Sequence, residues 1–159
     1  ASIPGAPEFL KRYSAKAAAA GVDPLGFAWG PFAYGAGQVL AQAADFTLIE
    51  GAGGWRVPLS DQANLSDLAM ALKLPVILVV GVRLGAISHA LLTAEAVARD
   101  GLHLAGWVAN IVDPKTARLE ENLATLAERI PAPCLGRVPK LKSVTADAVA
   151  EHLQLDLLD

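Results

Sequence analysis

The sequence predicts an α/β fold in which a mostly parallel sheet is covered by crossover helices. From Phe46 onward, short apolar runs alternate with longer runs whose apolar residues recur at helical spacing. The strongest apolar run, Val76–Gly81, is rich in β-branched residues and far shorter than the roughly twenty residues of a membrane-spanning helix. A chain of 159 residues, 53% apolar, can also bury a core without a disulfide or a metal.

Four short apolar segments, each bounded by glycine, proline or polar residues, are expected as strands. They are Phe46–Glu50, Val76–Gly81, Leu104–Ile111 and Cys134–Val138. Because helical periodicity separates them, the strands are expected to run parallel.

Three helices are expected between these strands. Asn64 followed by Asp67 marks the start of the first, Gly101 ends the second, and Pro114 precedes the third. The apolar positions that define them are Leu65, Leu68, Ala69 and Leu72, then Ile87, Leu91, Ala94 and Val97, and then Leu119, Leu123, Leu126 and Ile130.

The N-terminal part shows neither the helical nor the strand periodicity of apolar residues. Residues 1–37 are rich in glycine, proline and alanine, with a possible helix over Leu10–Ala20, and a second helix is expected over Gln38–Ala44. We therefore divide the chain into a poorly matched segment, 1–37, and an α/β domain, 38–159.

Composition excludes several classes of function. A formal charge of −3 is the wrong sign for a protein that binds nucleic acid through its phosphates. The longest uncharged stretch, Pro24–Ala44, contains prolines, glycines and glutamines that interrupt any membrane span. A single cysteine, Cys134, and no signal-peptide pattern favour a cytoplasmic location.

Candidate binding residues follow the strands, because ligands of parallel sheets bind where the carboxyl ends of the strands meet. All four post-strand loops are therefore expected at one edge. They begin at Glu50, Gly81, Asn110 and Arg137.

Glu50 precedes a loop with three glycines in four positions, Gly51–Gly54. A carboxylate there can hold Mg²⁺, and the small loop residues let a phosphate approach the backbone. The alternative is a solvated strand end followed by a simple turn.

Gly85, Ala86, Ile87 and Ser88 open the second helix, where free N–H groups and the helix dipole suit a carboxylate or phosphate. The alternative is that Ser88 merely caps that helix.

Asn110 carries the donor and acceptor that read the N6/N7 edge of adenine, although such a residue often bonds to a nearby loop instead. The loop Arg137–Lys140 is ambiguous in the same way, because its proline makes a rigid turn with or without a ligand.

Five segments, in this order and spacing, resemble dethiobiotin synthase. They cover the region from Asp45 to Leu141, and five motifs in order are more specific than any one of them. The segments are Thr47–Trp55, Pro58–Asp61, Leu74–Thr93, Ala105–Asn110 and Ile130–Gly136.

This resemblance implies a P-loop NTPase-like α/β fold and a homodimeric, ATP- and Mg²⁺-dependent ligase of biotin biosynthesis. Such an enzyme carboxylates 7,8-diaminopelargonic acid with CO₂, the carbamate takes the γ-phosphoryl group of ATP, and the second amine closes the ureido ring. The resemblance makes Glu50 the Mg²⁺ ligand, with Gly51, Ala52 and Gly53 beside the nucleotide. It implies that the substrate binds at Gly53 and at Gly85, Ala86, Ile87 and Ser88. It also implies that the adenine binds at Asn110, and that the base and ribose lie against Val138, Pro139 and Lys140.

The sequence departs from this family at its N-terminal end. In the family a P-loop, a catalytic lysine and a second Mg²⁺-binding aspartate precede the position of Glu50, and the 49 residues ahead of Glu50 supply none of them. We therefore expect an incomplete fold, a partial chain and no ATP turnover by this chain alone. The alternatives are a non-catalytic dimerisation scaffold, or a related ligase acting on another acid.

Overall fold

The computed structural model describes residues 48–51, 53–59, 61 and 63–158. The expected helices over Leu10–Ala20 and Gln38–Ala44, and most of the expected strand Phe46–Glu50, lie outside these residues, as does Ala52. The division of the chain at residue 37 stays a prediction.

Within the described residues, three parallel strands form one sheet, in the order β1-β2-β3. They are β1 (Val76–Gly81), β2 (Leu104–Asn110) and β3 (Cys134–Val138), so the bounds of the first and third are those predicted. The second strand ends one residue earlier than expected. The N–H of Ile111 still donates to the Val138 carbonyl, but the chain turns away there.

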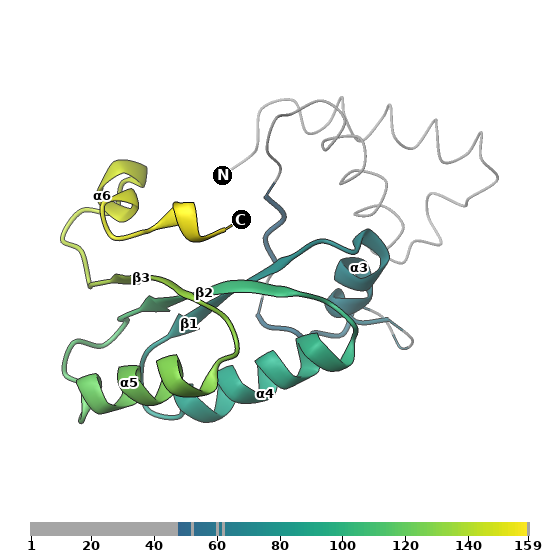
Figure 1. Ribbon diagram of the computed structural model, residues 1–159, viewed down its shortest axis with the longest axis horizontal. Helices are drawn as coiled ribbons and strands as arrows, with labels where there is room; N and C mark the ends of the chain where they lie inside the picture. Colours follow the sequence, from purple (N-terminus) through teal and green to yellow (C-terminus); the bar gives the residue numbers. More distant parts are fainter. Residues whose placement is uncertain (1–47, 52, 60, 62, 159) are drawn as a thin grey trace.

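Two helices connect these strands and cover one face of the sheet (Figure 1). They are α4 (Ala86–Arg99), between β1 and β2, and α5 (Leu119–Arg129), between β2 and β3. The helices contact each other, and α4 contacts β1 and β2. The predicted crossover architecture is therefore confirmed.

In the part of the chain that the structure describes, three shorter helices lie outside this repeating unit. The first, α3 (Leu65–Leu72), precedes β1, while α6 (Ala146–Ala150) and the 3₁₀ helix η1 (Leu155–Leu157) follow β3. The last two are too short to show a helical period in the sequence.

The predicted helix boundaries are confirmed at two of three places. Asn64 caps α3 in a reciprocal capping box, in which its N–H donates to Asp67 Oδ2 at 2.7 Å. Gly101, with φ of 76°, follows the C-cap of α4. Pro114 lies in a turn, and α5 begins five residues later, after Arg118 in a left-handed conformation.

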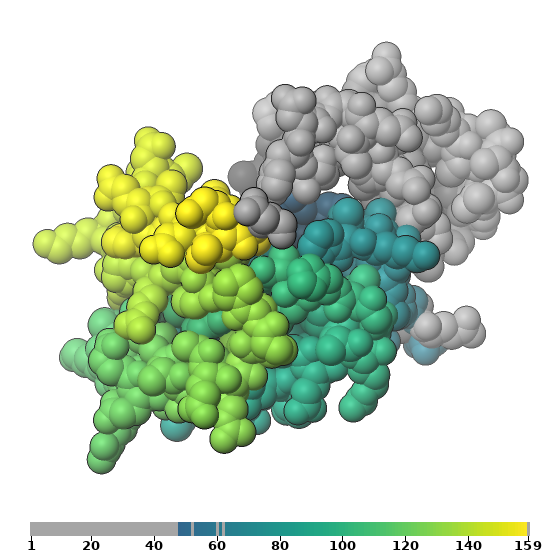
Figure 2. Space-filling view, viewed as in Figure 1, coloured from purple at the N-terminus to yellow at the C-terminus, as the bar shows by residue number. Residues whose placement is uncertain are grey.

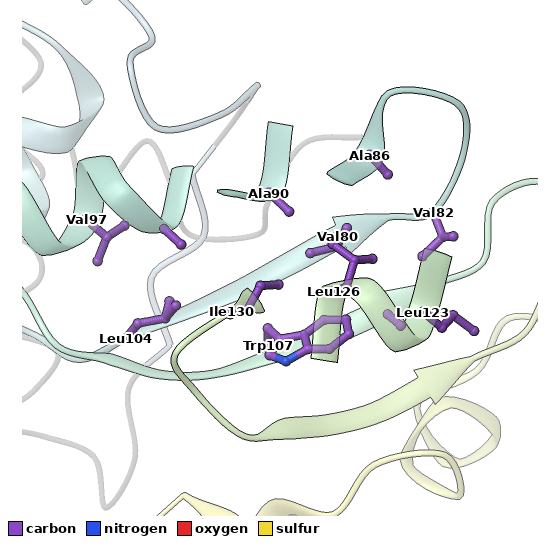
Figure 3. Close-up of a cluster of buried hydrophobic side chains, with 12 residues drawn as sticks. Val80, Val82, Ala86, Ala90, Val97, Leu104, Trp107, Leu123, Leu126 and Ile130 are labelled. Atoms are coloured by element: carbon purple, nitrogen blue, oxygen red, sulfur yellow. The ribbon is translucent and has the colours of Figure 1, made fainter. Parts of the chain in front are cut away.

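The main hydrophobic core lies between the sheet and the two crossover helices. Trp107 of β2 is 1% exposed and packs beside Leu126 and Ile130 of the α5 region and Val80 of β1 (Figure 3). Because side chains alternate along a strand, Val108 points to the other face.

That second face is covered by the C-terminal segment at β3 and is more open at β1. Figure 2 shows the yellow C-terminal segment lying directly against the yellow-green part of the chain. Val108, Leu135 and Val138 form a smaller cluster with residues that include Leu153. Val79 of β1 is 60% exposed. The C-terminal segment therefore completes the packing of β3, while β1 keeps an exposed apolar side chain.

The expected strand Phe46–Glu50 is wrong over its described residues. Leu48, Ile49 and Glu50 are exposed and form no strand. A strand is stable only when a neighbour satisfies its backbone, and in the described part of the sheet β1 pairs with β2 alone. No helix among the described residues is long and apolar enough to cross a membrane.

Candidate functional site

The carboxyl ends of the three strands meet at one edge of the sheet, at the left of Figure 1. Gly81 pairs in register with Asn110, and Asn110 with Val138. The N–H of Val82 donates to the Asn110 carbonyl at 2.7 Å, and that of Ile111 to the Val138 carbonyl at 2.9 Å. The structure therefore brings together three of the four predicted loops, and we call this the carboxyl edge.

The start of α4 lies at the carboxyl edge. Its N-cap is Gly85, with φ of 88° and no side-chain cap, so Ser88 is not the cap. The N–H of Ala86 is not free as predicted, because it donates to the Arg83 carbonyl at 3.0 Å. Ala86 is buried and Ile87 packs against the core, whereas Gly85 and Ser88 are exposed. A ligand at this helix start would therefore meet Gly85 and Ser88 first.

The nucleotide candidates lie side by side at the same edge. Asn110 is half-buried as the last residue of β2, and Val138 is 9% exposed as the last residue of β3. Pro139 and Lys140 follow directly and are exposed. An amide beside an apolar wall and an exposed cation can accept a flat base, a sugar and a negative charge.

The Glu50 loop lies against the start of α3. A Cβ on Gly51 would come within 2.8 Å of a methyl carbon of Leu65, and one on Gly53, which has φ of 89°, within 3.1 Å of Val57. Glu50 itself is exposed. These glycines therefore permit a close approach to the protein's own side chains.

The chain directly after this loop is attached to the opposite edge. Trp55 Nε1 donates to Asp100 Oδ2 at 2.7 Å, and Arg56 Nη2 donates to Asp100 Oδ1 at 2.7 Å. Asp100 follows the last residue of α4, and this 14-residue helix begins at the carboxyl edge and is about 21 Å long. The chain that follows Gly54 therefore lies at the opposite edge, and the expectation that the Glu50–Gly54 loop shares the carboxyl edge stays a prediction.

Sequence reasoning missed Asp100 and Ser66, which fix this segment. Arg56 Nη1 donates to Ser66 Oγ at 2.9 Å, and Ser66 is 1% exposed within α3. These partners are 10 to 45 residues apart in sequence. No local sequence pattern predicts contacts of this kind. Helical and strand periodicity indicates which side chains are buried, but it does not indicate which distant residues they contact.

The described residues contain no cluster of three or more His, Cys, Asp or Glu that could hold a metal ion. Glu50 is a single exposed carboxylate. One carboxylate fits Mg²⁺ where substrate phosphates and water supply the other ligands, as is usual in phosphoryl-transfer sites.

A surface hollow of about 430 Å³ opens at the edge opposite to Asn110, between the ends of α3 and α4. Its lining is polar and apolar in similar measure and contains none of the predicted binding residues. Besides Asp100 and Gly101 it is formed by Met70, Lys73, Leu74, Pro75, Leu102 and His103. The candidate site therefore rests on the strand ends rather than on this hollow.

The fold and the carboxyl edge define an α/β domain of P-loop NTPase type. The AAA domain family matches residues 11–148, and the chain belongs to this family. The predicted fold class is thereby confirmed.

Among curated proteins, the chain is 74% identical over 118 residues to the ATP-dependent dethiobiotin synthetase BioD of Pseudomonas aeruginosa strain PAO1, covering 74% of this chain and 52% of the relative. The proteins of the same name from Cellvibrio japonicus and Xanthomonas campestris pv. campestris are 63% and 51% identical, over 73% and 74% of this chain and 51% and 52% of theirs. The resemblance to dethiobiotin synthase is confirmed. The chain spans about half the length of the curated relatives it matches.

Proposed function

We propose that this chain forms the nucleotide- and substrate-facing edge of an ATP-dependent dethiobiotin synthetase. The observation that carries the proposal is the alignment of Gly81, Asn110 and Val138 at one sheet edge beside the start of α4. The names of its relatives supply the reaction, and membership of the AAA domain family favours ATP as the co-substrate.

In this proposal Asn110 recognises adenine. Its amide can donate to N7 or N1 of the ring and accept from the exocyclic amine. Val138 supplies an apolar contact next to it, and Pro139 and Lys140 line the ribose and the base. Lys140 is exposed, so its ammonium group can reach negative charge without being desolvated first.

The substrate is 7,8-diaminopelargonic acid, whose carboxylate would meet the start of α4. The exposed Gly85 and Ser88 offer backbone N–H groups at the positive end of the helix dipole. In a homodimer, a second subunit would close this end of the site. Sedimentation of the complete protein tests the dimer, and a monomer at tens of micromolar would contradict it.

Glu50 would hold Mg²⁺ through one carboxylate oxygen, and the ion when bound would neutralise phosphate charge. The residues of this chain then bind and orient the two substrates. Asn110 binds the base, and Gly85 and Ser88 bind the substrate carboxylate. A P-loop that cradles phosphates is absent from this sequence, so we propose that the chain alone does not turn over ATP.

The first test is Asn110→Ala in the complete protein that carries this chain. A lost adenine contact should raise KM for ATP about tenfold to a hundredfold, because a well-formed amide–adenine pair contributes about 1–3 kcal/mol of discrimination. Asn122→Ala on α5, where the amide donates only to the Ala117 carbonyl at 3.2 Å, is the matched control. Equal KM values for the two variants would contradict adenine recognition by Asn110.

The second test is Glu50→Gln, which replaces a hard anionic ligand with a neutral amide. Ring closure should fall by orders of magnitude while the unfolding curve is unchanged. Glu121→Gln on α5 removes the same charge from an exposed helix and should leave ring closure intact. Near-normal turnover in Glu50→Gln would reject the metal role. A complete protein that dimerises but has no activity would support a scaffold instead.

A further inference from the structure

One carboxylate holds two consecutive side chains from a distant part of the sequence. Asp100 accepts the Trp55 indole N–H at one oxygen and the Arg56 guanidinium at the other, both at 2.7 Å. Its side chain is 9% exposed, and Arg56 reaches on to Ser66 of α3. Both oxygens of Asp100 are thus engaged, and we call these four residues the Asp100 clamp.

The charges in the Asp100 clamp support each other. The hydrogen bond from Arg56, followed by that from Trp55, lowers the pKa of Asp100. The hydrogen bond to Asp100 in turn raises the pKa of Arg56. The pair therefore remains charged across the physiological pH range. The Arg56–Asp100 contact is a single charge-assisted hydrogen bond, and bonds of this kind are shorter and stronger than those between neutral groups.

The clamp fixes the chain directly after a glycine-rich segment. Trp55 follows Gly53 and Gly54 directly, and Gly53 adopts φ of 89°, a conformation that side-chain-bearing residues rarely take. Glycines lose more backbone freedom on ordering than other residues, so such a loop keeps one shape only where its ends are held. Beyond the clamp, the N–H of Leu65 donates to the Val57 carbonyl at 2.8 Å, which ties the segment to α3.

We propose that Asp100 is a positioning residue for the Glu50–Gly54 loop, acting through Trp55 and Arg56 from the edge opposite to the nucleotide candidates. This inference rests on the proposed function, because it makes the position of Glu50 depend on a residue that touches neither substrate nor ATP. Removing the clamp leaves the Glu50 side chain unaltered, but its loop can then adopt other backbone conformations.

The first arm of the test measures the loop without any ligand. Amide hydrogen exchange of a peptide spanning residues 53–66 is followed in the complete protein and in D100N and D100A. Exchange at the Leu59 and Leu65 amides should rise about tenfold in D100A, since local opening follows the loss of anchoring contacts. D100N should lie between, because its amide oxygen can still accept the Trp55 N–H. E121Q, which breaks the exposed Arg118–Glu121 pair, is the matched control.

The second arm separates positioning from general stability. With ATP, Mg²⁺ and the diamine, D100A should lower kcat about tenfold or more, since misplacing a reacting group by about 1 Å can cost on the order of a hundredfold. KM for ATP should change little, because Asn110 lies at the other edge. R56Q, which keeps the Trp55 contact, should have an intermediate effect on both arms.

Each outcome decides the proposal. Unchanged exchange in D100A overturns it, and so does faster exchange with an unchanged kcat, which leaves Asp100 a purely structural role. Faster exchange with a lower kcat and constant KM supports it. If the unsubstituted protein shows no ATP-dependent ring closure, the proposed function fails, while the exchange arm still decides whether Asp100 holds the loop.

Discussion

An added methyl group at Gly136 should strongly destabilise the packing on the second face of the sheet. A Cβ there would overlap the backbone carbonyl oxygen of His152 and lie 3.0 Å from its carbon and 3.1 Å from the Cα of Leu153. These are backbone atoms, so no rotamer change relieves the overlap. Gly136 also forms an antiparallel bridge with Leu153. The C-terminal segment must therefore move away from β3 in Gly136→Ala.

The expected loss of stability comes from the contacts that this movement breaks. The N–H of Gln154 donates to the Leu135 carbonyl at 2.7 Å, and such a bond contributes about 1 kcal/mol. Leu153 also packs against the cluster of Val108, Leu135 and Val138, and overpacking of a formed core costs about 1–3 kcal/mol. The free energy of unfolding should therefore fall by about 2–4 kcal/mol.

Urea unfolding of the complete protein measures this loss, with two glycine variants as controls. Gly101→Ala meets no atom within 4 Å but must adopt φ of 76°, so it should cost about 1–2 kcal/mol. Gly54→Ala meets neither atom nor positive φ and should stay within about 0.5 kcal/mol of the parent. If Gly136→Ala were as stable as Gly54→Ala, the close packing of the C-terminal segment on β3 would be refuted.

Three further predictions concern the core, a helix cap and acid stability. Leu126→Ala removes a fully buried side chain and should lower the free energy of unfolding by about 2–5 kcal/mol, whereas Leu92→Ala, at a side chain 60% exposed, should change it by less than about 0.5 kcal/mol in the same urea titration. Asp67→Ala removes half of the capping box of α3 and should cost about 1 kcal/mol, with faster amide exchange confined to that helix; exchange rising across the whole domain would contradict this. Because the Arg56 hydrogen bond lowers the pKa of Asp100, the stability that Asp100 contributes is complete above its ordinary pKa of 3.8 and is lost as the pH falls through the lowered value. The stability difference between the parent and Asp100→Asn should therefore disappear only in strong acid, and a difference already lost near neutral pH would be inconsistent with the ion pair.

The central βαβ architecture could be predicted from the sequence because its signals are local. Val76–Gly81 and Cys134–Val138 are short apolar runs between breakers, and their strands have those bounds. Asn64 and Asp67 are three residues apart, the spacing at which each side chain reaches the other's backbone N–H. The meeting of Asn110 and Val138 also follows from sequence, because parallel strands end at the same edge.

The strand expected at Phe46–Glu50 shows the limit of local reasoning. An apolar run forms a strand only where a neighbouring strand accepts its hydrogen bonds. Leu48–Glu50 form no strand, and β1 pairs with β2. The roles proposed for Glu50 and for the start of α4 come from family resemblance and chemistry, and they remain predictions.

The sequence by itself determined the order of β1, α4, β2, α5 and β3, the start of α3, and the ends of β1 and β3. These features depend on residues within one or two turns of each other. Only the tertiary structure decided that Asp100 holds Trp55 and Arg56, 45 and 44 residues away, and that His152 closes over Gly136. Such contacts depend on where the packed helices and strands bring distant segments together. Periodicity records which face of an element is buried, but it does not record which segment covers that face.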